Sequence, residues 1–325
     1  MKKNIIISSI TLILFVVLCY FFNWLILYGI RNVKTYEFGI WNKIVNGQCN
    51  SSILITGSSR SALHFSPSEI SKVTGETVFN IGMIGSLPNV QYPRLEVYLS
   101  NNKLPKIVIQ EVNIMNLCYI QTIYDEKQYL PYLDQDIIYK NLISIDKDFV
   151  LRKYLPLYGF SLYNKYYLTN SFTGFKQQIL GKINTNFDFD NGFQNLNLPW
   201  DGNADEFYKK NKNGKTFPIE KRGIEKIEEI ILKVKSSGSD IILVNTPEYY
   251  EIQPYLANKK EIFDIYKSIA KKHNIEFWDY SDIPMSKVKE NFYNSMHLQG
   301  DSAKRFSTVF GNDLKIYLQK KDKRI

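Results

Sequence analysis

A serine-containing turn and a distant histidine have the chemistry of a nucleophile and its base. Residues 57–60 read GSSR, and His297 lies in the segment 293–298 (YNSMHL). A serine in a tight, glycine-led turn that enters a helix presents its hydroxyl to solvent. A histidine that reaches this hydroxyl can act as general base, so the pair could form an acyl-serine. Taken alone, His297 could equally be a helix-capping or core histidine.

Two later segments contain groups that could stabilise an oxyanion, and the residue after the two serines of the turn is a cation that could bind substrate. The glycines of segment 80–86 (NIGMIGS) let backbone N–H groups approach an oxyanion, and the amide of Asn113 could donate a further hydrogen bond. Arg60 could bind an anionic substrate or pair with Glu111, and the sequence leaves both open.

The other two histidines have simpler interpretations. His64 is expected about one helical turn beyond the serines, where it would point along its own helix rather than serve as their base. His273 ends a Lys-Lys-His run and is interpreted as part of a solvated helix terminus.

These groups can meet only if the chain folds as alternating strands and helices. Helical patterns predict helices near 66–75, 88–101, 218–238, 259–272 and from 301 onward. Short apolar, β-branched runs predict five strands, at 52–56, 77–80, 106–111, 240–245 and 275–278. The alternation predicts a flavodoxin-like, doubly wound α/β sheet of about five mainly parallel strands. Ligands bind beyond the carboxyl ends of such strands, where the candidate groups lie.

An insertion at about 114–217 separates the third and fourth strands. It is rich in Tyr, Phe, Asn and Lys, and it is too long for a simple loop. We expect a helical or mixed cap over the sheet edge, within one α/β domain spanning 51–325. Its aromatic side chains could line a sugar or lipid groove, although packing of the cap itself is favoured.

The beginning of the sequence predicts a membrane anchor. No charged residue occurs from Asn4 to Ile30, and this apolar run exceeds the roughly 20 residues needed to cross a bilayer. It is also longer than the apolar core of a signal peptide, and no small-x-small cleavage site follows it. We therefore expect a single-pass anchor at 1–31, a juxtamembrane linker at 32–50 and an extracytoplasmic domain. Basic residues flank the helix on both sides, so they support this orientation only weakly.

Composition narrows the choice of partners. The net charge is +9, but the lysines are scattered, which disfavours nucleic acid and suits anionic lipids or polymers. With three histidines and three cysteines, none at ligand spacing, no metal site is expected. Cys19 lies in the predicted span, which leaves Cys49 and Cys118 as a conceivable but unproven disulfide pair.

Four segments, in the same order, resemble the sequence blocks of the SGNH (GDSL-like) hydrolases: 57–61 (GSSRS), 80–86 (NIGMIGS), 111–113 (EVN) and 294–307 (NSMHLQGDSAKRFS). The resemblance covers most of 52–113 and 218–317. Its segments NTPEYYE and FWDYSD look like those of membrane-anchored members related to cell-surface polysaccharide O-acyltransferases and esterases. It implies that Ser59 is the nucleophile and His297 the base. The implied oxyanion hole is formed by the Ser59 N–H, Gly85 and Asn113.

Two residues depart from the family pattern. Ser58 stands where the first block usually has aspartate, and Asn294 stands at the aspartate of the usual Asp-x-x-His block. An asparagine can orient the imidazole of His297 through its carbonyl but cannot stabilise the imidazolium by charge. In a serine protease this exchange costs about 10⁴ in turnover. A substitute carboxylate would have to be brought to the histidine by the fold; the candidates are Asp279, Asp282 and Asp301.

The resemblance implies serine-dependent acyl (acetyl) transfer or ester hydrolysis on a cell-envelope polysaccharide or glycopolymer. No cofactor is implied, and a transferase would need an acyl donor, for which a membrane protein is one candidate. The alternative is a non-catalytic glycan-binding or assembly protein of the cell surface, which Asn294 favours. The sequence leaves the acyl group and the sugar open.

Overall fold

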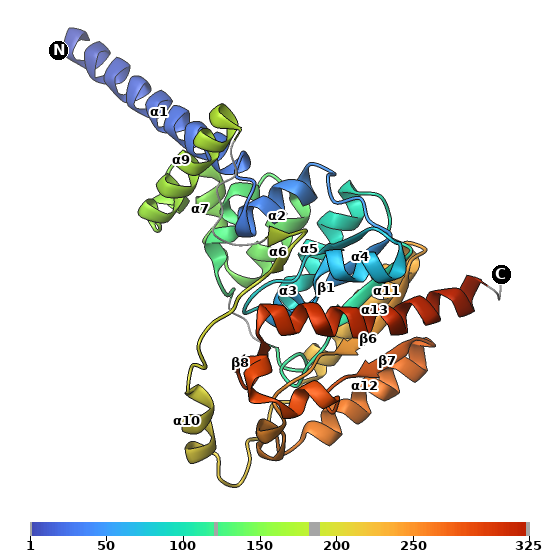
Figure 1. Cartoon of the computed structure of the whole chain (residues 1–325). Coiled ribbons are helices and arrows are strands. Elements are labelled where there is room, and N and C mark those ends of the chain that lie inside the picture. The colour runs from blue at the N-terminus through green and yellow to red at the C-terminus, as the bar shows by residue number, and fades with distance from the viewer. Residues whose placement is uncertain (1, 120–122, 182–188, 323–325) are drawn as a thin grey trace. The chain divides into compact units, whose positions relative to one another are not determined.

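The computed structural model describes residues 2–119, 123–181 and 189–322. The chain forms two compact units (Figure 1): Met1–Val45 with Asp125–Asn184, and Asn46–Tyr124 with Thr185–Ile325. The sequence predicted a single α/β domain over 51–325. By compactness, the middle of the insertion instead groups with the N-terminal residues.

The second unit contains the predicted parallel sheet. Its five strands have the order β2-β1-β3-β6-β7, and every neighbouring pair is parallel. The strands are β1 (Ile53–Thr56), β2 (Val78–Asn80), β3 (Ile107–Glu111), β6 (Asp240–Asn245) and β7 (Glu276–Asp279). The three inner strands are almost entirely buried, because helices cover both faces of the sheet. The predicted fold class is confirmed.

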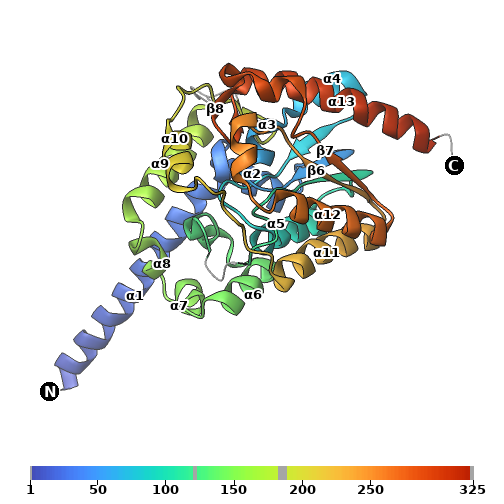
Figure 2. The same cartoon turned by 90° about the horizontal axis from the view of Figure 1, so that it is seen from below.

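Helices pack on the two faces of this sheet, as Figure 2 shows. One face carries α3 (Ser59–His64), α4 (Pro67–Thr74) and α13 (Gly300–Asp322), and the other carries α5 (Pro88–Asn101), α11 (Lys221–Ser236) and α12 (Lys259–His273). The core under α13 is aromatic, with Phe65 and Phe310 in edge-to-face contact at 4.9 Å between ring centroids. This core fixes α3, which begins at Ser59.

Short elements complete the second unit and carry part of the candidate site. Asn294 and His297 lie on an antiparallel pair, β8 (Phe292–Asn294) and β9 (His297–Leu298). The remaining short elements are β4 (Phe189–Asp190), β5 (Phe193–Gln194), α10 (Asn203–Lys210), η3 (Tyr250–Tyr255), η4 (Pro284–Lys287) and η5 (Lys289–Asn291).

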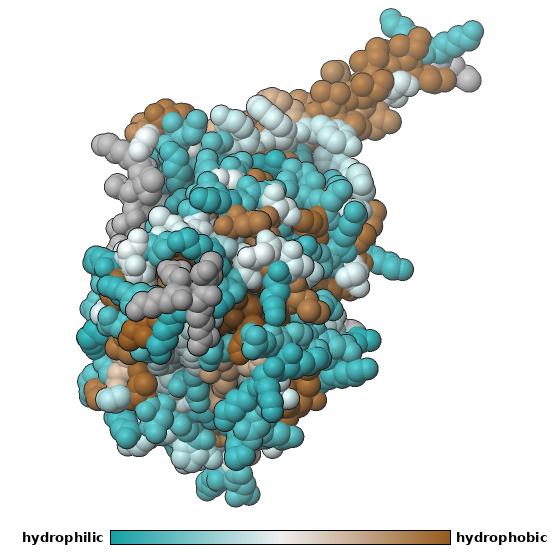
Figure 3. All heavy atoms as spheres, turned by 90° about the vertical axis from the view of Figure 1, so that its right-hand side faces the viewer, coloured by the Kyte–Doolittle hydropathy of each residue, from teal (hydrophilic) through white to brown (hydrophobic). Residues whose placement is uncertain are grey.

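The first unit is helical and includes the candidate membrane span α1 (Lys2–Arg31). At 1.5 Å per residue its 30 residues extend about 45 Å, more than the roughly 30 Å of a bilayer's hydrocarbon core. Among the described residues it is the one helix long and apolar enough to cross a membrane, and its hydrophobic surface is brown in Figure 3. Gly29 of α1 meets Gly174 closely: a Cβ on Gly174 would lie 1.8 Å from the Gly29 carbonyl oxygen. The helices of this unit are α2 (Tyr36–Val45), η1 (Glu126–Gln128), η2 (Leu130–Tyr132), α6 (Asp136–Ile145), α7 (Phe149–Tyr154), α8 (Tyr158–Ser161) and α9 (Asn164–Leu180).

The segment 32–50, predicted as a juxtamembrane linker, contains helix α2 (Tyr36–Val45). The α2 residue Trp41 is fully buried, stacks on Tyr132 and donates a hydrogen bond to Gln128 (3.1 Å). Some aromatic side chains of the insertion thus pack the first unit itself, as with Tyr167, which is also fully buried, whereas Tyr154 and Phe172 are exposed. In the second unit, the Cys49 and Cys118 thiols are both free, so the disulfide is not formed.

Candidate active site

Ser59 and His297 meet although they lie 238 residues apart in the sequence. Ser59 is the first residue of α3, and it follows Gly57, whose φ of +143° favours glycine. Its Oγ lies 2.9 Å from Nε2 of His297, and Nδ1 of His297 lies 3.0 Å from Oδ1 of Asn294. The structure therefore brings the three predicted catalytic residues into one hydrogen-bonded chain.

Asn294 determines which nitrogen of His297 carries the proton. Its Oδ1 also accepts the backbone N–H groups of Met296 (3.0 Å) and His297 (2.9 Å), which identifies this atom as the carbonyl oxygen. Because the oxygen can only accept, Nδ1 of His297 must donate to it. Nε2 then has a free lone pair directed at the Ser59 hydroxyl, which is the tautomer a general base requires.

The environment of His297 disfavours the charged imidazolium. The pKa of His297 is lowered to about 4, chiefly by burial and then by the charge of Arg60, while the carboxylate of Asp201 opposes the shift. The three aspartates considered as substitutes for a triad carboxylate make other contacts instead: Asp279 with Ser281, Asp282 with Lys287 and Asp301 with Asn197. His297 is thus a neutral but weak base.

The low pKa of His297 predicts an unusual pH profile. Catalysis needs the neutral imidazole, which is lost only when the pH falls through the pKa, so kcat/KM should hold until about pH 4. An unperturbed histidine would lose activity near about pH 6.5. The profile is measured with a small ester from pH 3.5 to 8, with return to pH 7 as the control for unfolding. An acid limb centred near pH 6.5 would contradict the lowered pKa of His297.

The first serine of the turn, Ser58, belongs to a hydrogen-bonded network around the buried carboxylate of Glu111. Its Oγ donates to Glu111 (2.7 Å), and its N–H donates to the same carboxylate oxygen (2.9 Å). The amide of Asn113 donates to Glu111 (2.8 Å) and to Ser58 (3.2 Å). Both amide hydrogens are therefore used, and Asn113 would have to release one to reach an oxyanion. Its oxyanion-hole role stays a prediction.

Gly85 is an exposed residue of the loop that follows β2, and its backbone conformation requires glycine. Its φ is +67°, and a Cβ there would lie 2.3 Å from the Tyr124 ring. The N–H of Met83, in the same loop, donates to the Gly57 carbonyl (2.9 Å), which ties the loop to the serine turn. Within the described part of the chain, the N–H groups of Ser59 and Gly85 donate no hydrogen bond, so both are free for an oxyanion.

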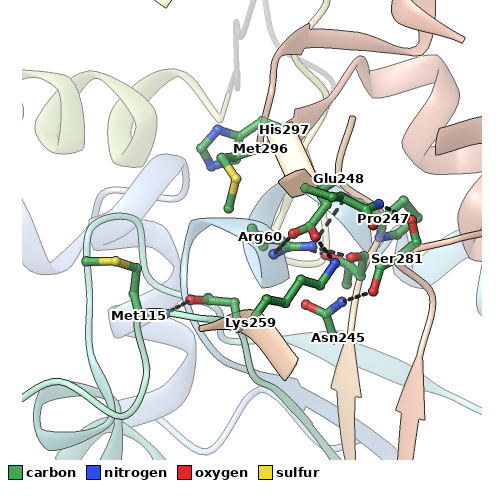
Figure 4. A network of polar contacts seen from close by, with 12 residues as sticks. Arg60, Met115, Asn245, Pro247, Glu248, Lys259, Ser281, Met296 and His297 are labelled. Carbon is green, nitrogen blue, oxygen red and sulfur yellow. Dashed lines mark hydrogen bonds and ion pairs between the residues drawn. The ribbon is translucent and has the colours of Figure 1, made fainter. Parts of the chain in front are cut away.

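Arg60 is enclosed behind the site. Only 2% of it is exposed, and its guanidinium donates to Oγ1 of Thr246 (3.0 Å). It also donates to the buried carboxylate of Glu248 (3.3 Å), as Figure 4 shows. Arg60 does not pair with Glu111, because Glu111 accepts hydrogen bonds from Ser58 and Asn113 instead. Substrate binding by Arg60 stays a prediction, and it would require the guanidinium to leave Glu248.

His64 links the two elements that carry the candidate nucleophile and base. Its Nε2 accepts the N–H of Leu298 in β9 (3.1 Å), and its Nδ1 donates to Oγ1 of Thr246 (2.7 Å). Burial, with the charges of Arg60 and His297, lowers the pKa of His64 well below its usual value, so the ring is neutral. The expectation that His64 points along its own helix is wrong. Both partners are distant in sequence, so no local pattern could reveal them.

A pair of His64 variants tests this positioning role. His64→Leu removes the acceptor for Leu298 and should lower kcat by about 10²-fold, the cost of a displacement of about 1 Å at a catalytic group. His64→Gln can place its Oε1 where Nε2 lies and should recover most of the loss. The measurement is kcat and KM on a small ester, with thermal unfolding as the control. Equal losses in both variants, or none in either, would contradict the role.

No family model matches this chain, and no curated protein matches it. Solved structures do match. A family two carbohydrate esterase from Clostridium thermocellum, in complex with cellohexaose, aligns over 82% of this chain and 64% of its own at 7% identity and a TM-score of 0.40. A variant of an acetyl-xylooligosaccharide esterase from Geobacillus stearmophilus aligns over 82% and 94% at 13% identity and a TM-score of 0.36. The chain spans less than two thirds of the Clostridium protein, and likenesses this distant carry no argument about activity.

Proposed function

We propose that this protein is a serine-dependent enzyme of the SGNH type that transfers or hydrolyses an acyl (acetyl) ester on a cell-envelope polysaccharide or glycopolymer. The observation that carries the proposal is the chain Ser59–His297–Asn294, with contacts of 2.9 and 3.0 Å and the tautomer that a base requires. The polysaccharide substrate rests on the sequence resemblance alone.

The mechanism follows from these atoms. Nε2 of His297 takes the hydroxyl proton as Oγ of Ser59 attacks the ester carbonyl, and the oxyanion meets the N–H groups of Ser59 and Gly85. The C–O bond to the alcohol then breaks, and His297 returns the proton to the leaving oxygen. Water or a second hydroxyl, deprotonated by His297, attacks the acyl-serine and completes hydrolysis or transfer. Asn294 holds the imidazole in the productive tautomer without adding charge.

A non-catalytic glycan-binding or assembly role is the second candidate. The weak base at His297 and the uncharged Asn294 favour it. The test supplies a small acetyl ester to the full chain, with and without a soluble glycan as acceptor. A hydrolase releases acetate in both reactions, whereas a transferase forms new glycan ester only with the acceptor. If neither free acetate nor glycan ester forms, the enzymatic proposal is contradicted.

The location proposed for this activity is the extracytoplasmic face of a membrane, with α1 as the anchor. The bilayer would hold the enzyme near surface polymers and thereby raise its effective concentration there. An acyl-donor protein in the same membrane is the further partner that a transferase would need.

The anchor predicts how the protein fractionates. The full chain should stay in membranes through carbonate extraction, because α1 lacks charged residues across its apolar length. A single Leu14→Arg change should weaken retention, since an arginine at the middle of a span costs about 2.5–3.5 kcal/mol on insertion scales. Extraction of the wild-type chain into the soluble fraction would rule the anchor out.

A further inference from the structure

An apolar pocket of about 350 Å³ opens beside His297. Its walls come from the loop after β3, from α10, from η3 and from the β8–β9 turn. His297 and Asn294 are part of the lining, so the pocket begins at the proposed catalytic base. Helix α10 belongs to the sequence insertion, for which the proposed mechanism has no role.

The lining away from His297 is mainly apolar. Phe217 and Ile252 are 7% and 3% exposed and form the deep part. Met296 lies beside His297 in Figure 4, and Met115 also lines the pocket. Methionine side chains adapt to flexible apolar ligands, which suits an alkyl chain. A hydroxyl-rich sugar would find few hydrogen-bond partners in such a lining, where the polar residues besides His297 and Asn294 are Asp201, Asn203 and Ser295.

We infer that this pocket binds the hydrocarbon chain of the acyl group, and that the preferred acyl group is longer than acetyl. The inference rests on the proposed function, because it takes the ester to join a glycan to an acid. In such an ester the acyl chain is the apolar part, and the pocket is the apolar surface next to the base. A volume of about 350 Å³ lies within the range of about 300–1,000 Å³ of ligand pockets, whereas the methyl group of an acetyl ester would leave most of it unfilled.

Ala204 offers a way to fill the pocket without touching the catalytic residues. It lies in α10, is 2% exposed and lines the pocket. The phenylalanine side chain in Ala204→Phe should occupy the space proposed for the hydrocarbon chain of the acyl group. Asp205→Phe is the matched control, because it adds the same ring at the next residue of the helix, which is exposed and outside the lining.

Two isomeric esters distinguish the acyl side from the alcohol side. Ethyl hexanoate and hexyl acetate have the same atoms, but only the first has its long chain on the acyl group. The full chain in lipid nanodiscs should cleave ethyl hexanoate with a kcat/KM at least about ten-fold above that of hexyl acetate and of ethyl acetate. Ala204→Phe should remove this preference, while Asp205→Phe keeps it. Equal rates for the isomers, or a preference for hexyl acetate, would overturn the inference.

Calorimetric binding of hexanoate to the Ser59→Ala protein separates failure of the pocket from failure of the enzyme. Suppose that the protein with Ser59 intact cleaves no ester, but that hexanoate binds and Ala204→Phe removes this binding. The proposed function would then be refuted, and the assignment of the pocket would stand. If the protein cleaves esters but neither binds hexanoate nor prefers one isomer, the assignment of the pocket to the acyl chain is refuted. The proposed enzymatic function would then still stand. If Ala204→Phe does not fold, the isomer ratio and hexanoate binding of the unsubstituted pocket still decide.

Discussion

Replacing Ser59 with alanine is expected to abolish acyl-serine formation and to lower ester turnover by up to about 10⁶-fold, the cost of removing the nucleophile in a serine protease. The Ser59 hydroxyl is the group that faces the lone pair of His297, at 2.9 Å. Any residual rate would come from oxyanion stabilisation and substrate binding alone. The measurement is kcat on a small acetyl ester, before and after the substitution.

The neighbouring serine provides the matched control for this change. Ser58→Ala removes the same atom one residue earlier, but Ser58 points to the buried Glu111 and not to His297. This variant should lose stability, because a buried carboxylate loses a donor, and it should still form the acyl-serine. The assignment of the nucleophile would be refuted if Ser58→Ala were inactive and Ser59→Ala active.

Replacing Asn294 with aspartate is expected to accelerate acyl-serine formation, by an amount that could approach about 10⁴-fold. The carboxylate would sit 3.0 Å from Nδ1 of His297, where it stabilises the imidazolium that forms as the serine proton is taken. It should also raise the pKa of His297 above about 4 and so make it a stronger base. The gain should be greatest near neutral pH and shrink as the pH falls toward the raised pKa.

The wild type and two further variants, Asn294→Leu and Ser59→Ala, serve as controls for Asn294→Asp. Asn294→Leu keeps the size of the side chain but removes the hydrogen-bond acceptor for Nδ1 of His297. It should lower the rate, because the imidazole can then adopt the tautomer that is protonated on Nε2. Silence of the wild type with activity in Asn294→Asp would indicate an intact site that lacks its charge. Silence in the wild type, Asn294→Asp and Ser59→Ala alike would favour the glycan-binding or assembly role over the enzyme.

The sheet was predictable because its strands are buried on both faces and therefore read as short, uninterrupted apolar runs. The prediction 240–245 coincides with β6, and 106–111 differs from β3 by one residue. The meeting of Ser59 and His297 was anticipated by the family resemblance and by the rule that ligands bind at the carboxyl ends of strands.

Contacts set by tertiary packing were not predictable. The carboxylate partner of Arg60 is Glu248, 188 residues away, and nothing in the sequence distinguishes it from Glu111. The fully buried Trp41 lies in a stretch that reads as a linker, because its partner Tyr132 belongs to the insertion. The apolar pocket was not predictable for the same reason, since its walls come from five segments that are separate in the sequence.

The central claim is that Ser59 is a nucleophile activated by His297. Its most direct test is labelling of the full chain with a fluorophosphonate, followed by mass spectrometry of the modified peptide. We predict an adduct on Ser59 in the wild type, none in Ser59→Ala, and slow labelling in His297→Ala, where the base is missing. A folded wild-type protein that takes up no label, or takes it up on a different serine, would contradict the claim.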